Sequence, residues 1–278
     1  MLLSAGEARE LSAQRVDAKA RLAVRHAGGR TQIRQLYQEG AKIRMPRVQA
    51  DPLEAILINT AGGLTGGDRI SWQIEADAAS SVTVTTQACE KLYRSHSGKA
   101  RAEVRLEAGR GARIAWLPQE TIVYDRSSFS RRLEADLAED AEALIVEATL
   151  FGRLAMGETV SQALFRDRWR VRRGGRVIHA EEFAIGPELG ATLARPAAAG
   201  GGRAIATVLY VAPEAETLLP QVRQILGEDG GASFWTVGET GKLLARLVAG
   251  DGYRLRQRLG PLVSLLNGQA GLPKVWSL

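Results

Sequence analysis

The sequence has little cysteine: Cys89 is the only one among 278 residues. A single cysteine excludes an internal disulfide framework and a zinc site built from CxxC pairs. The three histidines, His26, His96 and His179, lie far apart in the sequence. Tight transition-metal sites gather several imidazole, thiolate or carboxylate ligands. The sequence therefore predicts no stable metal site and no tightly bound cofactor.

Long apolar runs are also missing. No run approaches the roughly 20 residues that a membrane-spanning helix requires. The first residues, MLLSAGEARE, carry a very short apolar patch followed by acids, whereas a secretory signal starts with basic residues and continues with a longer apolar core. We therefore expect a cytoplasmic protein that does not bind a membrane.

Basic residues are in excess, and arginine supplies most of them: the formal net charge is +6, and only six of the 37 basic residues are lysine. Such a balance suits nucleic acid or an acidic partner, so a basic β-rich nucleic-acid-binding module is the alternative function. In RDRWRVRR, however, Arg168, Arg170 and Arg172 share one face of an extended chain, and Trp169 and Val171 share the other. This pattern favours a half-buried strand with a solvated outer face. Aromatic residues, at 5%, are too few for stacking along a single strand of nucleic acid.

The dominant hydrophobic period is two. Five segments either alternate between apolar and polar residues or are continuously apolar, and glycine or proline residues separate them. They are SVTVTTQA, ARAEVRLEAG, GARIAWLP, ALIVEATLF and AIATVLYVA. RRGGRV is typical of a hairpin with a two-residue Gly-Gly turn. Many short strands without intervening helices predict a mainly β, layered fold.

Helices are expected late in the chain. APEAETLLPQVRQILGEDGG has apolar residues at helical spacing, with Pro220 in the first turn. DGYRLRQRLGPLVSLLNG predicts a second helix that Asp251 could cap and that Pro261 should kink or split. The stretch ARPAAAGGGRA (194–204) is typical of a flexible surface loop.

NTAGGLTGGD (59–68) is dense in glycine, like a phosphate-binding loop. The Walker A spacing from Gly62 to Gly67 fits, but Asp68 stands where lysine is needed and Arg69 where a hydroxyl is needed. A strand-like segment follows, so no helix N-terminus receives an anion. The sequence therefore predicts a loop whose glycines serve backbone shape, and Ser-His-Asp and HExxH patterns are absent too.

Four segments in order, NTAGGLTGGD, VTTQACEKLYRS, WLPQETIVY and FGRLAMGE, followed by a terminal LPKVW, resemble the urease accessory protein UreD (UreH) family. The resemblance runs from about Arg44 to the C-terminus. It implies a single UreD-type domain over residues 1–278, a layered, helix-like stack of antiparallel and mixed strands, and a few helices, mostly C-terminal. It also implies a scaffold without enzymatic activity and without nucleic-acid or membrane partners.

The implied partners are the urease apoprotein, UreF and, through UreF, the GTPase UreG. The implied activity is nickel insertion into urease through an internal nickel path. Asp68 and Glu158 stand inside the motifs and are candidates for transient nickel contact; the alternatives are a turn residue and an ion-pair partner of Arg153. Thr85 and Gln87 could line a polar interior, or belong to a hydroxyl ladder.

The remaining motif residues are assigned to partner contact or to structure, with no choice between the two. They are Gly62, Gly63, Gly66, Gly67, Thr86, Lys91, Tyr93, Arg94 and Arg153. Cys89 and His96 point to opposite faces on one continuous strand, unless a turn reverses this. Whether either contacts nickel stays open.

Overall fold

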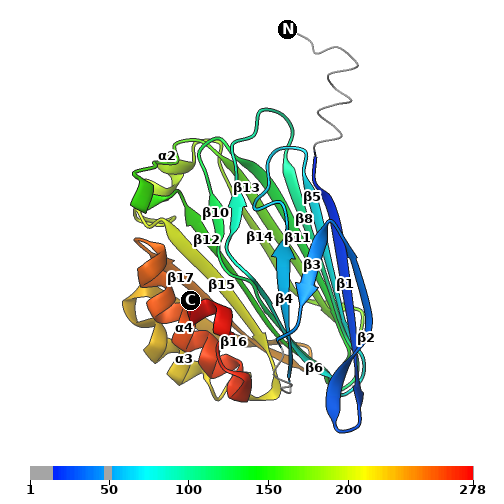
Figure 1. Ribbon diagram of the computed structural model, residues 1–278. Coiled ribbons are helices and arrows are strands. Elements are labelled where there is room, and N and C mark those ends of the chain that lie inside the picture. The colour runs from blue at the N-terminus through cyan, green and yellow to red at the C-terminus, as the bar shows by residue number, and fades with distance from the viewer. Residues whose placement is uncertain (1–14, 47–51, 278) are drawn as a thin grey trace.

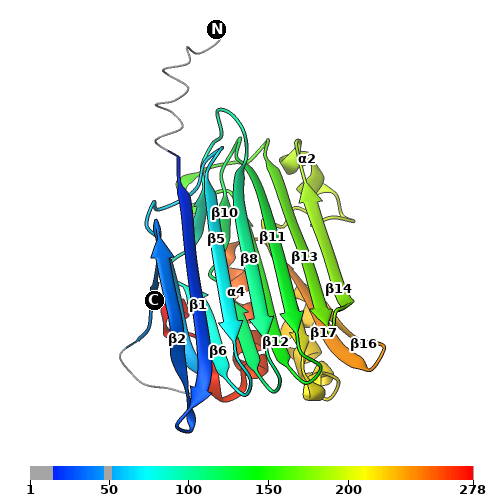
Figure 2. The ribbon, with the colours of Figure 1, turned by 90° about the vertical axis from the view of Figure 1, so that its right-hand side faces the viewer.

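Two β-sheets and a C-terminal pair of helices make up the structure, a computed structural model that describes residues 15–46 and 52–277 (Figure 1). The seven-stranded sheet has the order β14-β13-β11-β8-β5-β1-β2 (Figure 2). Its strands are β1 (Asp17–Ala27), β2 (Arg30–Glu39), β5 (Arg69–Ala76), β8 (Ala100–Ala108), β11 (Ser128–Leu137), β13 (Leu164–Arg173) and β14 (Arg176–Ile185).

The ten-stranded sheet has the order β16-β17-β15-β12-β9-β6-β4-β3, with β10 pairing β12 and β7. Its strands are β3 (Ala41–Arg44), β4 (Leu53–Asn59), β6 (Ser81–Thr86), β7 (Glu90–Leu92), β9 (Arg113–Leu117), β10 (Thr121–Val123), β12 (Glu142–Phe151), β15 (Ala204–Val211), β16 (Gly230–Val237) and β17 (Thr240–Ala249). The α-helices are α2 (Leu189–Ala194), α3 (Leu219–Leu226) and α4 (Gly252–Leu266).

The chain alternates between the two sheets from β5 to β13, so each turn of the chain adds strands to both sheets. Neighbouring strands in this central part are parallel and in register, as in β5, β8 and β11. Antiparallel pairs stand at the edges, including β1–β2 and β13–β14. The predicted mainly β, layered fold is thereby confirmed.

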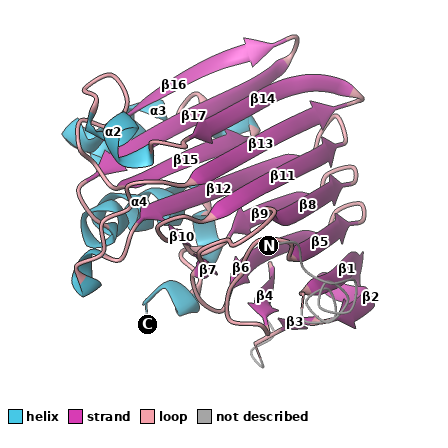
Figure 3. Cartoon of the chain, turned by 90° about the horizontal axis from the view of Figure 1, so that it is seen from above, coloured by secondary structure: helices cyan, strands magenta, loops and turns pink. Residues whose placement is uncertain are grey.

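The ten-stranded sheet has a hydrophobic core on each of its two faces. One lies between the sheets and includes Trp116, Phe129 and Trp169. The other lies between the ten-stranded sheet and helices α3 and α4, which cover its opposite face (Figure 3). The apolar stripe of α4 is part of this second core, because its five members are all buried. They are Leu255, Leu259, Leu262, Val263 and Leu266.

Several local predictions are confirmed. Gly174 and Gly175 form the β13–β14 turn with φ of +54° and +78°, and Pro220 lies at the start of α3. The Asp251 carboxylate accepts a hydrogen bond from the Arg254 amide and caps α4. Pro261 was predicted to kink or split this helix, and it does not split it, since α4 runs through it unbroken.

The arginine-rich strand β13 also matches expectation: Trp169 and Val171 are fully buried, while Arg166 and Arg168 are exposed. These arginines are not a uniform basic surface, however. Arg166, Arg168 and Arg170 all lie within 4 Å of the carboxylate of Glu182 on β14. An outer face with interleaved acids repels phosphate as well as attracting it, which argues against nucleic-acid binding there. In residues 15–46 and 52–277 no helix combines the length and apolarity of a membrane span.

Candidate functional site

The glycine-rich loop is held by the segment that follows β6. Leu64 bonds the backbone on either side of Leu92: the Leu64 amide donates to the Lys91 carbonyl and the Tyr93 amide donates to the Leu64 carbonyl, each at 2.8 Å. The Thr65 hydroxyl donates to the Arg94 carbonyl at 2.8 Å. The first two sequence motifs therefore form one structural unit.

Two of the loop glycines sit where another residue would collide with its neighbours. A Cβ on Gly63, whose φ is +155°, would lie 2.4 Å from the Tyr93 ring and 2.7 Å from the Lys91 carbonyl oxygen. A Cβ on Gly66 would lie 2.0 Å from the Ser95 hydroxyl. Gly62 and Gly67 have positive φ as well, +73° and +95°. The loop thus uses glycine for shape and close approach.

Asp68 closes this loop through the backbone. One carboxylate oxygen accepts from the Val16 amide at 3.0 Å and the other from the Thr65 amide at 2.8 Å. Its side chain is only 4% exposed. In this structure Asp68 joins the glycine loop to the start of β1.

Glu158 holds the fourth motif together in a similar way. Its carboxylate accepts from the Arg153 side chain at 2.8 Å and from the Arg153 and Asp125 amides at 3.2 and 3.3 Å. The Arg153 guanidinium stacks 4.2 Å above the Tyr124 ring, which packs edge-on against Tyr93. Tyr93 thereby connects the fourth motif to the glycine loop.

The Thr85 hydroxyl bonds the C-terminal segment, and the Thr86 hydroxyl bonds the third motif, WLPQETIVY. The buried Thr85 hydroxyl accepts from the Trp276 indole at 3.1 Å, and the Thr86 hydroxyl accepts from the Gln119 amide at 2.9 Å. Gln87 is exposed. In the described part of the chain, no hydrogen bond or ion pair joins Asp68, Glu158, Thr85 and Gln87 to one another.

Charged residues that were not singled out from the sequence meet between the two sheets. Arg131 of β11 forms an ion pair with Asp167 of β13, at 3.0 and 2.5 Å, and a second ion pair with Glu147 of the opposite sheet. All three residues are at most 6% exposed. Tryptophan N–H groups bond both acids, Trp116 to Glu147 and Trp169 to Asp167, each at 3.0 Å.

Burial sets the charge states of this interior cluster. Desolvation raises the pKa of Glu147 to about 7, although Arg131 opposes the shift, and the charge of Asp167 adds to it. The two carboxylates keep the pKa of Arg131 above its ordinary value despite burial. The cluster therefore holds one permanent cation and a carboxylate, Glu147, that gains or loses a proton near neutral pH.

Further polar side chains continue from this cluster toward the glycine loop. The Arg131 guanidinium donates to the Thr121 hydroxyl at 3.3 Å, and Thr121 is the register partner of Glu90 in the parallel pair β10–β7. Glu90 accepts two hydrogen bonds from the Asn59 amide, at 3.0 and 3.1 Å. Burial raises the pKa of Glu90 to about 7, and the nearby charge of Asp68 contributes.

We name this set the interior polar series: Asp68, Asn59, Glu90, Thr121, Arg131, Glu147 and Asp167. Arg131, Glu147 and Asp167 lie among the apolar side chains between the sheets, Asp68 and Thr121 are buried too, and Asn59 and Glu90 are half-buried. A sequence signal for part of it exists. Glu147 occupies the same strand face as Ile145 and Phe151, and Asp167 the same face as Phe165 and Trp169. Carboxylates in such apolar rows have to be buried.

No group of three or more His, Cys, Asp or Glu side chains could hold a metal ion within residues 15–46 and 52–277. His96 is exposed. The Cys89 thiol donates to the Glu120 carboxylate at 3.4 Å, and burial raises its pKa to about 11. Metal binding at Cys89 would have to displace this proton, because the ligand is the thiolate.

Comparison with known proteins adds a family relationship. A family model described as UreD urease accessory protein matches residues 16–277, which begins well before the Arg44 predicted from the motifs. A Mesorhizobium japonicum protein named urease accessory protein UreD is 63% identical over 267 residues, which cover 96% of this chain and 95% of that protein. Urease accessory protein UreD 1 of Brucella abortus is 60% identical, with 96% of each chain covered. Its counterpart in Brucella anthropi is 56% identical, with both chains fully covered.

Proposed function

Because this chain belongs to the UreD family of urease accessory proteins, we propose that it is a non-catalytic scaffold in urease maturation. It binds the urease apoprotein and UreF, and through UreF the GTPase UreG. The glycine-loop contacts support this division of labour, because a loop closed by Asp68 and clamped to β7 offers no cradle for a nucleotide phosphate. GTP chemistry then belongs to UreG.

Nickel is the cargo, and we place its passage along the interior polar series. The observation that supports this route most directly is the pair of buried carboxylates, Glu147 and Asp167, that meet across Arg131 between the two sheets. Buried charges are costly, and hydrophobic replacements are often more stable, so stability alone does not account for this cluster. Carboxylate oxygens are acceptable ligands for nickel.

The route requires weak binding. An ion that must leave a site cannot be held by a closed cluster of histidines and thiolates. Arg131 stands between Glu147 and Asp167 as a competing cation, and a protonatable Glu147 weakens any contact further. Asp68 and Glu158 lie at the motif end of the route and contact nickel transiently in this proposal. Thr85 and Gln87 are not part of the route, because Thr85 bonds Trp276 on the helix-covered face of the ten-stranded sheet and Gln87 is exposed.

The substitution Glu147→Gln tests the route. Glutamine keeps an oxygen that accepts from the Trp116 indole, but it removes the charge and places an amide NH2 group against the Arg131 guanidinium, so the stability of the variant is measured as well. We expect normal assembly with UreF and apo-urease, together with a lower nickel content and activity of the urease produced. Glu182→Gln, on the outer face of the seven-stranded sheet, removes the same charge away from the route and should leave nickel content unchanged.

Asp68→Asn and Glu158→Gln extend the test to the motif end. Each replaces an oxygen acceptor that holds a backbone amide, so assembly has to be measured together with nickel content. Normal assembly with less nickel would support transport at these acids. Loss of assembly would assign them to loop structure, and wild-type urease activation by all three variants would place the route elsewhere.

A further inference from the structure

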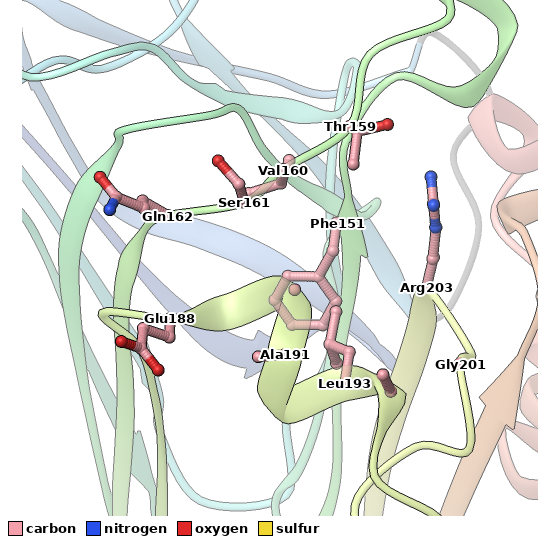
Figure 4. Close-up of a pocket in the computed structure, with 12 residues that line it drawn as sticks. Phe151, Thr159, Val160, Ser161, Gln162, Glu188, Ala191, Leu193, Gly201 and Arg203 are labelled. Atoms are coloured by element: carbon pink, nitrogen blue, oxygen red, sulfur yellow. The ribbon is translucent and has the colours of Figure 1, made fainter.

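A cavity of about 530 Å³ opens beside α2 (Figure 4). Helix α2 lies at the end of the sheets where β12 ends (Figure 1). The end of β12, the segment 159–162, α2 and the segment 201–203 form its walls. Phe151 begins the FGRLAMGE motif and lines the cavity, and Thr159 follows the motif and lines it too. The interior polar series does not contribute to it.

The cavity is apolar at its base and charged at its ends. Phe151, Val160 and Leu193 form the base, and the methyl group of Ala191 lies at its wall. Arg203 stands at one end and Glu188 at the other, as Figure 4 shows. A ligand that fits has an apolar centre and a negative group on the Arg203 side.

Arg203 is the informative residue. Its backbone is fixed on both sides, since its amide donates to the Ala249 carbonyl at 2.9 Å and its carbonyl accepts from the Phe151 amide at 2.8 Å. Its side chain is half-buried, yet it forms no ion pair within the residues that the structure describes. Arg153, by contrast, forms an ion pair with the Glu158 carboxylate. A half-buried arginine on a hydrogen-bonded backbone, with no acid partner among the described residues, suits a carboxylate from outside.

Two exposed apolar side chains lie in the chain segment that joins two walls of the cavity. The residues between Phe151 and Thr159 include Leu154, which is 42% exposed, and Met156, which is 73% exposed. A small molecule that fills the cavity cannot also cover these two side chains. A polypeptide segment can, and methionine adapts well to a bound partner.

We propose that this cavity is a docking site for a partner-protein segment in which an aliphatic side chain stands next to an acidic residue. The aliphatic side chain seats against Phe151, Val160 and Leu193, and the carboxylate pairs with Arg203. Leu154 and Met156 cover the flanking residues of the segment. Glu188 fixes the direction in which the partner segment binds, because it repels the acidic residue of that segment.

The test uses the full chain and two blocked pentapeptides, acetyl-Gly-Leu-Glu-Leu-Gly-amide and its Gln counterpart. Methyl NMR signals of Val160 and Leu193 report binding inside the cavity. We expect both signals to shift when the acidic peptide binds. The Gln peptide should bind about tenfold more weakly, because one charge-assisted hydrogen bond contributes about that factor to the affinity. Arg203→Gln should remove this difference. Arg195→Gln changes an exposed arginine outside the cavity and should preserve it.

Three results would overturn the proposal. One is equal binding of the acidic and Gln peptides to the unmodified protein. Another is the absence of any shift at Val160 and Leu193. The third is that acetyl-leucine, a small carboxylate, binds as tightly as the acidic peptide, which would indicate a small-molecule pocket. Ala191→Phe, which fills the cavity, should block the peptide and checks that binding occurs there. The outcome does not depend on nickel transport.

Discussion

Alanine substitution at three glycines of the same loop separates backbone conformation from steric contact. Gly62 has φ of +73°, and no atom lies within 4 Å of the position that an alanine Cβ would take, so alanine costs only the left-handed conformation, about 1 kcal/mol. Gly66 has no positive φ, but its Cβ would lie 2.0 Å from the Ser95 hydroxyl and 2.2 Å from the Ser97 carbonyl. Overpacking of this kind costs roughly 1–3 kcal/mol.

Gly63 combines both penalties. Its φ is +155°, and a Cβ would approach both the Tyr93 ring and the Lys91 backbone. The Lys91 carbonyl cannot move away freely, because it accepts the hydrogen bond from Leu64 that holds the loop. We therefore expect Gly63→Ala to lower the free energy of unfolding by about 3 kcal/mol or more.

Urea unfolding followed by circular dichroism measures the three variants side by side. The expected order of destabilisation is Gly62→Ala, then Gly66→Ala, then Gly63→Ala, and the last should lower the midpoint by roughly 1 M urea. Equal stability of all three variants would refute the steric argument. Calorimetry with GTP and ATP should show no binding to the unmodified protein, and micromolar affinity for either nucleotide would contradict a purely structural loop.

Two further predictions concern buried charges. Because burial raises the pKa of Glu147 from 4.5 to about 7, the folded state holds a proton that the unfolded state releases in this window. Stability should then fall by up to about 3 kcal/mol as pH rises from 4.5 to 7, and Glu147→Gln should reduce this slope in urea titrations. Arg256→Met leaves the buried carboxylate of Glu120 unpaired and should cost about 3–5 kcal/mol. Arg258→Met breaks a half-exposed pair with Asp229 and should cost about 1 kcal/mol or less in the same assay.

Local features of the fold could be predicted because they depend on neighbouring residues. Alternation along β8 follows from period two, and its buried and exposed residues alternate without exception. The Gly174–Gly175 turn and the Asp251 cap follow from backbone conformation and from one nearby carboxylate acceptor. The β16–β17 hairpin was not predicted, since its strands carry a weaker alternation.

The candidate site could be predicted only in part. The sequence indicated that Glu158 pairs with Arg153 or contacts nickel, and the ion pair is present. It placed Thr85 in a possible polar interior, but that hydroxyl bonds Trp276, a residue 191 positions away. A partner so distant in sequence is decided by how the C-terminal segment packs, which no local pattern encodes.

The sequence by itself determined the family, the mainly β architecture and the backbone role of the glycines in the loop, because these depend on residue order, period and local backbone requirements. The tertiary structure alone decided which charges meet. Arg131, Glu147 and Asp167 lie on three strands and in two sheets, so their meeting depends on the layering and register of those sheets. Arg203 is likewise ordinary in sequence, and it becomes a candidate anchor only because the fold leaves it half-buried with no acid partner in residues 15–46 and 52–277.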